Sequence, residues 1–158
     1  MNKLPRKRLV VIVTAALLLT GGGIAFAYWS AGGAGTGSAT TGTNVPITAV
    51  QTSTITNMGP GDSAQTLFGN FNNTNSGPVY VTNVVASISS VTQASGAVGA
   101  CDATDYSLAN ATMGVTAEVA AGSGKGAWTG ATIKFNDKVG TLQDGCKGAT
   151  VNIAYAVN

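Results

Sequence analysis

The sequence contains no histidine, and this absence excludes several kinds of active site. A Ser-His-Asp triad needs an imidazole to take the proton of the nucleophile, and a catalytic cysteine needs a similar base. The two cysteines, Cys101 and Cys146, are too few for a zinc site without histidine. Carboxylates are present, but no spacing places two of them across a cleft as in a glycosidase. The sequence therefore predicts a protein that is not an enzyme and that uses no metal or cofactor.

Charged residues are also scarce, at 9% of the chain, and both arginines, Arg6 and Arg8, lie at its very beginning. The rest of the chain carries four lysines against six acidic residues, a formal charge of −2. A nucleic-acid-binding protein needs a basic face, usually rich in arginine, to neutralise phosphates. The composition therefore excludes nucleic acid as a partner and predicts a neutral, hydroxyl-rich surface.

The N-terminal segment has the three parts of a secretory signal peptide. A basic stretch comes first, an apolar run over residues 9–19 follows, and a glycine triplet at residues 21–23 interrupts it. Ala25 and Ala27 then offer small side chains at the two positions that a signal peptidase reads. These features predict that signal peptidase and the general secretory machinery are partners of the chain.

Two outcomes are open for this segment. Removal of residues 1–27 would leave Tyr28 as the new N-terminus, and the glycine triplet favours this outcome. The alternative is a membrane anchor, because the apolar stretch over residues 9–29 is long enough to span a bilayer. In both cases the rest of the chain faces outward, so we expect a secreted or cell-surface protein whose only membrane contact is this segment.

The two cysteines lie in the exported part of the chain, where the environment is oxidising. One disulfide between Cys101 and Cys146 is then the expected state. Closing a loop of this length stabilises a domain by about 4 kcal/mol in the chain-entropy model. Both cysteines fall in predicted loops, so the bridge is expected to join loops at one end of the fold.

The remainder of the chain predicts a flexible leader followed by one β domain. Residues 28–44 are almost wholly small or polar and read as the leader, and the domain covers residues 45–158. Apolar residues alternate with polar ones in three places, as expected for strands that bury one face. These strands centre on residues 113–119, 131–135 and 151–157.

Four further segments are rich in β-forming residues, and they cover residues 45–56, 64–73, 79–92 and 106–108. The second segment would turn Leu67, Gly69 and Phe71 inward. The third has apolar residues of both parities, which indicates burial on both faces or a bulge. Turn signals separate the segments, among them Gly122-Ser123-Gly124.

About seven strands and no helical periodicity predict an all-β fold. We expect an antiparallel β-sandwich of immunoglobulin-like or jelly-roll type, preceded by the hydrophobic N-terminal helix. The arrangement of a tryptophan packed on a disulfide between the sheets is not evident from the sequence.

Two stretches give the chain a family resemblance. The first is GGGIAFAYWS at residues 21–30, and the second is NMGPGDS at residues 57–63, followed by a strand and then NTNSGPVYV at residues 73–81. This layout resembles the secreted TasA/camelysin-type proteins, whose signal peptides go to a dedicated SipW-type signal peptidase, and small exported proteins of high-GC Gram-positive bacteria. The resemblance implies a jelly-roll domain and a place at the cell surface or in a biofilm matrix, where some members polymerise into fibres.

Two groups of residues are candidates for ligand binding. A Cys101–Cys146 bridge would bring Asp102, Asp105 and Asp144 into one neighbourhood, and carboxylates gathered in loops suit calcium. The alternative is that these aspartates form Asx-turns and caps in solvent. The second group is aromatic and could stack on a sugar or pack in the core and at strand edges: Trp29, Trp128, Tyr80, Tyr106 and Tyr155.

These observations favour an exported, non-enzymatic structural or adhesive protein of the cell surface or extracellular matrix. The alternative is a secreted monomeric module that binds a cell-wall glycan or a small ligand. A partner in the cell envelope or self-association fits the first hypothesis. We expect a soluble monomer in dilute solution, with association that depends on conditions, because the Gly-rich leader loses much entropy when it is ordered.

Overall fold

The computed structural model describes residues 32–158, so the predicted signal peptide, its cleavage site and the alternative anchor lie outside the described residues. Residues 32–47 carry no regular secondary structure, and those up to residue 46 are exposed. Residues 42–158 form one compact unit. Among the residues that are described, no helix has the length and apolar character needed to cross a bilayer.

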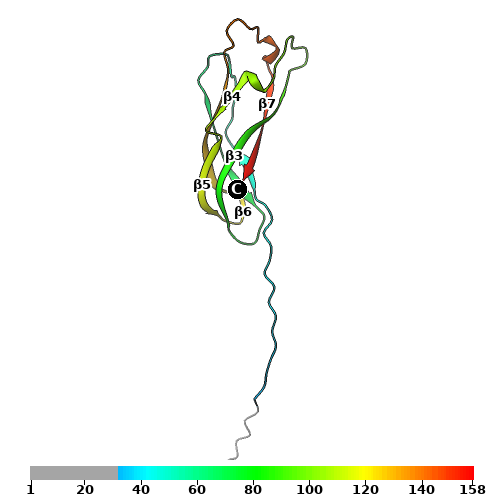
Figure 1. Cartoon of the computed structure of the whole chain (residues 1–158), viewed down its shortest axis with the longest axis vertical. Coiled ribbons are helices and arrows are strands. Elements are labelled where there is room, and N and C mark those ends of the chain that lie inside the picture. The colour runs from blue at the N-terminus through cyan, green and yellow to red at the C-terminus, as the bar shows by residue number, and fades with distance from the viewer. Residues whose placement is uncertain (1–31) are drawn as a thin grey trace, which may run out of the picture. The chain divides into compact units, whose positions relative to one another are not determined.

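The compact unit is an antiparallel β-sandwich of seven strands, as the sequence predicts (Figure 1). One sheet has four strands in the order β1-β2-β6-β4, and the other has three in the order β5-β3-β7. The strand bounds are β1 Thr48–Gln51, β2 Gln65–Asn73, β3 Val79–Thr92, β4 Tyr106–Ala109, β5 Thr112–Val119, β6 Gly122–Phe135 and β7 Thr150–Val157. Two short 3-10 helices complete it, η1 Ala103–Asp105 and η2 Asp144–Cys146.

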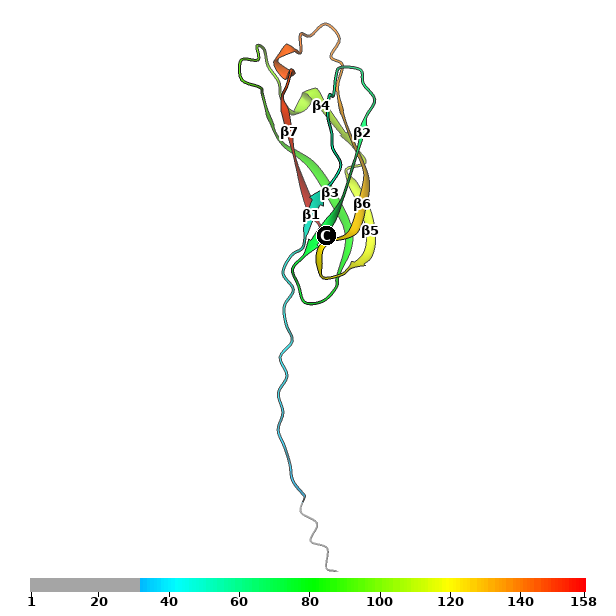
Figure 2. The ribbon, with the colours of Figure 1, turned by 180° about the vertical axis from the view of Figure 1, so that it is seen from behind.

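The two ends of the sandwich differ. The chain enters beside the β2–β3 turn, where the backbone N–H of Val45 donates to Asn75 Oδ1 at 2.7 Å. The loops of residues 93–105 and 136–149 lie together at the opposite end, because β3 runs the length of the sandwich between its two connections (Figure 2). We call these two loops, which the Cys101–Cys146 disulfide joins, the disulfide end.

The core lies between the two sheets and follows the predicted alternation. Leu67 and Phe71 of β2 are fully buried, as are Ala131 and Ile133 of β6. Trp128 of β6, which is 2% exposed, packs on Tyr155 of the opposite sheet with ring centroids 4.6 Å apart. Both aromatic side chains therefore hold the two sheets together, in agreement with the core packing expected for them.

The mixed parity of β3 has its cause in two bulges. The register with β5 shifts between Val81 and Asn83, and the register with β7 shifts between Ile88 and Ser90. Each shift moves the buried positions to the other parity, so Val81 and then Val84 both face the core. Of the two explanations left open by the sequence, the structure shows the bulge.

Two predicted boundaries were wrong. The first strand covers only four residues of the predicted 45–56, because the N–H groups of Thr52 and Ser53 both donate to Phe68 O and this bulge ends the ladder. Gly122-Ser123-Gly124 is not a turn but the beginning of β6, so Trp128 lies in the middle of that strand. Gly122 and Gly124 both adopt positive φ; Gly122 pairs with Asn73 of β2, whereas Gly124 falls at a shift of register, and a turn motif does not reveal this arrangement.

Candidate functional site

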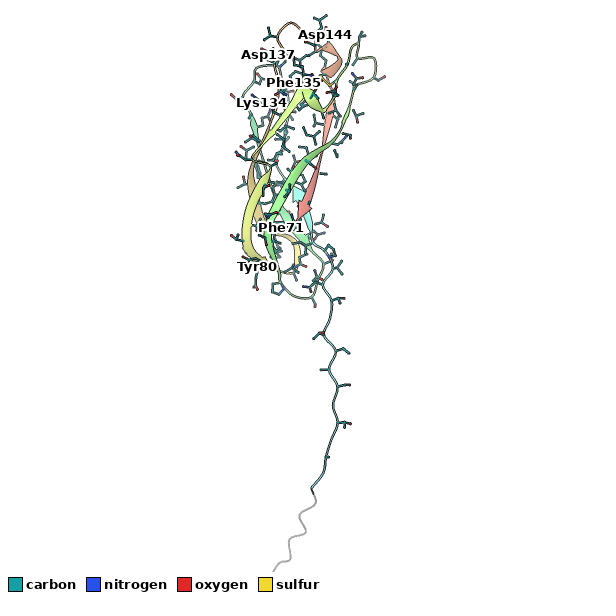
Figure 3. The ribbon with its side chains drawn as sticks, in the orientation of Figure 1. Phe71, Tyr80, Lys134, Phe135, Asp137 and Asp144 are labelled. Carbon is teal, nitrogen blue, oxygen red and sulfur yellow. A yellow bond between two sulfur atoms is a disulfide. The ribbon has the colours of Figure 1, made fainter. Side chains whose placement is uncertain are left out.

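The chemistry-bearing side chains of the sandwich gather at the disulfide end. The predicted Cys101–Cys146 bridge is present, with the two Cα atoms 5.0 Å apart, and it joins the loop before η1 to η2. Beneath it, Tyr106 and Phe135 form an edge-to-face pair with centroids 5.1 Å apart. These residues make a small second core, separate from the main one, and Phe135 lies close to the loops in Figure 3.

Asp105 is the centre of a hydrogen-bond network at this end and is only 5% exposed. Lys138 Nζ lies 2.8 Å from its Oδ1, and Gln143 Nε2 donates to the same oxygen at 3.0 Å. The backbone N–H of Asp102 donates to Oδ2 at 2.9 Å. Asp105 therefore ties η1 to the β6–β7 loop from which Lys138 and Gln143 come.

These donors decide the charge of Asp105. Burial opposes the charged form and by itself raises the pKa. The hydrogen bonds from Lys138, from the Asp102 backbone and from Gln143 outweigh it and leave the pKa of Asp105 below its ordinary value. A carboxylate held ionised by three donors is a weak general base, and its role here is architectural.

The other two aspartates of the calcium hypothesis have different partners. Asp102 is the N-cap of η1 and accepts from the N–H and hydroxyl of Thr104, which lower the pKa of Asp102. Asp144 is exposed and pairs with Lys147 at 2.9 Å. The loop-cap alternative therefore describes Asp102, and the three carboxylates form no shared cluster.

A second group of side chains, two cysteines and one aspartate, is also unsuitable as a metal site. Within residues 32–158, one group of three potential ligand side chains lies within 4.8 Å, namely Cys101, Asp105 and Cys146. Both sulfur atoms belong to the disulfide and are not thiolates.

A groove of about 390 Å³ runs along the sandwich between the chain that follows β1 and the free side of β7. Gln51, Ile55 and Met58 line one wall, and Val151 and Ile153 of β7 line the other. Its lining mixes amide, hydroxyl and aliphatic groups, and no carboxylate faces it. Tyr106 and the disulfide residue Cys146 lie at its base, and its volume is sufficient for a small or extended ligand.

A smaller hollow of about 330 Å³ lies at the disulfide end itself. Met58, Pro60, Phe135 and the exposed Leu142 supply its apolar lining. This hollow was not predicted from the sequence, because its residues come from two stretches that are far apart in the chain, 58–60 and 135–147.

The aromatic side chains do not form one platform for a sugar. Trp128 is buried and donates its indole N–H to Asn70 O at 2.9 Å, whereas Tyr80 is 60% exposed on β3. Tyr106 is buried under the disulfide. Tyr155 donates its hydroxyl to Gln51 Oε1 at 2.6 Å, and burial raises the pKa of Tyr155 to about 12. Trp29 lies outside the described residues.

Three residues that hold the disulfide end together were not predicted from the sequence, namely Asn136, Lys138 and Gln143. Gln143 accepts from the N–H of Lys138 through Oε1 and donates to Asn136 O, so one amide closes the whole loop. Asn136 also donates to Thr104 O and contacts the hydroxyl of Ser107. The sequence Asn136-Asp137-Lys138 is typical of a turn, and such a motif indicates that a loop is present but does not indicate its contacts.

Comparisons of the chain with protein-family models, with curated proteins and with solved structures gave no match.

Proposed function

We propose that this chain is an exported, non-enzymatic structural or adhesive protein of the cell surface or extracellular matrix. The observation that carries the proposal is the use of polar groups at the disulfide end. Asp105, Lys138 and Gln143 bind one another and hold the loops, so the groups best suited to chemistry serve the architecture. A disulfide-crosslinked sandwich of this kind suits a structural protein that has to remain folded outside the cell. The disulfide is compatible with that extracellular location.

Cell fractionation with an antibody against the sandwich tests this proposal. We expect the protein in the extracellular or surface-bound fraction, and its intact mass should correspond to a chain that begins at Tyr28. Deleting the gene should weaken cohesion of the surface layer, and the wild-type gene should restore it. Protein found in the cytoplasm with free thiols would contradict the proposal.

A secreted binding module is the second candidate, and the 390 Å³ groove beside β7 is the observation that favours it. Ile153→Trp would fill this groove from β7, and Thr92→Trp places the same side chain on an exposed strand position as a control. Soluble cell-wall fragments titrated by calorimetry should bind the wild type and the control but not the filled variant. Absence of binding to the wild type would remove this candidate and leave the structural one.

A further inference from the structure

The most exposed large apolar side chains among residues 32–158 all lie at the disulfide end. Val139 is 93% exposed, Leu142 is 88% exposed and Val98 is 82% exposed. Val98 belongs to the loop of residues 93–105, and the other two belong to the loop of residues 136–149. We call these three side chains the apolar tip.

The loops that carry the apolar tip are held by their own polar side chains. The side chain of Gln143 hydrogen-bonds to the backbone of Asn136 and of Lys138. Val139 and Leu142 lie in the short stretch of chain that these hydrogen bonds close. Gln93 donates to Gly99 O at 2.8 Å and to Gly145 O at 3.3 Å, so it ties the loop of Val98 to η2. Polar groups therefore point inward and apolar groups outward, which is the reverse of an ordinary surface loop. A fixed apolar surface loses little entropy when it is covered.

One residue of the apolar tip, Leu142, also borders an apolar hollow. This hollow of about 330 Å³ is lined by Met58, Pro60 and Phe135 together with Leu142, whose side chain is 88% exposed. A protruding side chain and an apolar hollow on one patch are self-complementary, because a twofold axis places each protrusion over the hollow of the other copy. Asp137 also lines this hollow together with the exposed Asp144–Lys147 ion pair, so Lys147 can face Asp137 of the other copy across the same axis.

We propose that the disulfide end binds a second copy of this chain, tip to tip, through a twofold contact in which Leu142 of each copy enters the hollow of the other. A lipid surface fits less well, because the hollow carries Asp137 and Asp144 against one lysine and no arginine lies in the described domain. Val45, near the beginning of the compact unit, lies at the opposite end beside Asn75, so a tip-to-tip contact leaves that end of each copy uncovered. This arrangement deepens the proposed adhesive function, and its link to cell cohesion rests on that function.

Sedimentation velocity over a concentration series tests the contact itself on the chain without residues 1–27, which retains the whole compact unit. We expect a monomer in dilute solution and a dimer at high concentration. Leu142→Glu should lower the association constant about 100-fold, because each dimer buries two Leu142 side chains and the loss of each lowers that constant about tenfold. Val139→Asp should weaken it as well. Val45→Glu is the matched control, because Val45 is 59% exposed at the other end, and it should leave association unchanged.

Beads to which many copies of the chain are attached by the N-terminus give a second readout, because many weak contacts between two beads together produce strong binding. Wild-type and Val45→Glu beads should aggregate, and Leu142→Glu beads should stay dispersed. The contact is refuted if the wild type stays monomeric at about 1 mM, the weak end of specific association, or if Leu142→Glu associates as the wild type does. Leu142-dependent binding to zwitterionic vesicles without self-association would replace the second copy by a membrane. Because these assays use purified protein, their failure leaves the surface location untouched.

Discussion

Among the glycines of residues 32–158, Gly69 is the one at which an added Cβ would lie nearest to other atoms. It lies on β2 opposite Trp128 of β6, and the indole occupies the space in which a side chain would stand. A Cβ atom at Gly69 would lie 2.5 Å from Trp128 Cζ2 and would overlap the carbonyl oxygen of Val50. The Gly69→Ala substitution therefore forces either the tryptophan or strand β1 to move.

Neither neighbour can move freely, and this sets the magnitude. Trp128 is held by its hydrogen bond to Asn70 O and by its packing on Tyr155. Overpacking a dense core costs about 1–3 kcal/mol, and releasing one hydrogen bond adds about 1 kcal/mol. We expect Gly69→Ala to lower the free energy of unfolding by about 3 kcal/mol. For a unit of this size the melting temperature should fall by about 12 °C.

Thermal unfolding followed by circular dichroism and by tryptophan fluorescence measures this loss. Gly114→Ala is the matched control, since Gly114 is an exposed strand glycine with nothing within 4 Å of its Cβ position. The control should be neutral or stabilising by a few tenths of a kcal/mol or more. If Gly69→Ala melts within about 2 °C of the wild type, a scale of about 0.5 kcal/mol, the packing argument for Trp128 is wrong.

Three further predictions follow from the disulfide end and from β5. Unfolded, unreduced protein should show no free thiol from Cys101 or Cys146, and reduction should cost about 4 kcal/mol of stability; a pair of titratable thiols would contradict this. The folded pKa of Asp105 lies below its unfolded value, so its contribution to stability is present above about pH 4 and is lost as the pH falls through the folded pKa. Urea unfolding across an acid pH series should therefore show that Asp105→Asn loses less stability on acidification than the wild type. Equal losses in the two proteins would refute the network. Thr116 is exposed with φ of 47°, so Thr116→Gly should stabilise by about 1 kcal/mol in the same assay, and a lower stability would show that its backbone is not strained.

The sheets could be predicted because their signal is periodic. Burial on one face requires alternation, and the strand around Ile133 shows it clearly, as does β7 around Tyr155. The bulges of β3 were visible as a change of parity, although their partners were not. The beginning of β6 was missed because glycines with positive φ have the composition of a turn whether or not they pair.

The candidate site could be predicted only in outline. Two cysteines in an exported chain give the bridge, but no periodic signal connects Gln143 to Asp105, which lies 38 residues away in sequence. The apolar tip is hidden for the same reason. Val139 and Leu142 are of residue types that are usually buried, but in this loop they are exposed while Lys138 and Gln143 make the inward contacts.

The order of the strands has a consequence for how the chain reaches its fold. Only β1 and β2 pair with a strand adjacent in sequence, and every connection after β2 crosses from one sheet to the other. β2 pairs with β6, and β3 pairs with β5 and β7, all of which come later in the chain. Most pairings therefore require the closure of a long loop, and its entropy cost precedes the gain from the contacts. Such topologies fold in about milliseconds to seconds rather than microseconds. A nascent chain that lacks β6 and β7 can form only the β1–β2 and β3–β5 pairs, so neither sheet is complete until these last two strands arrive.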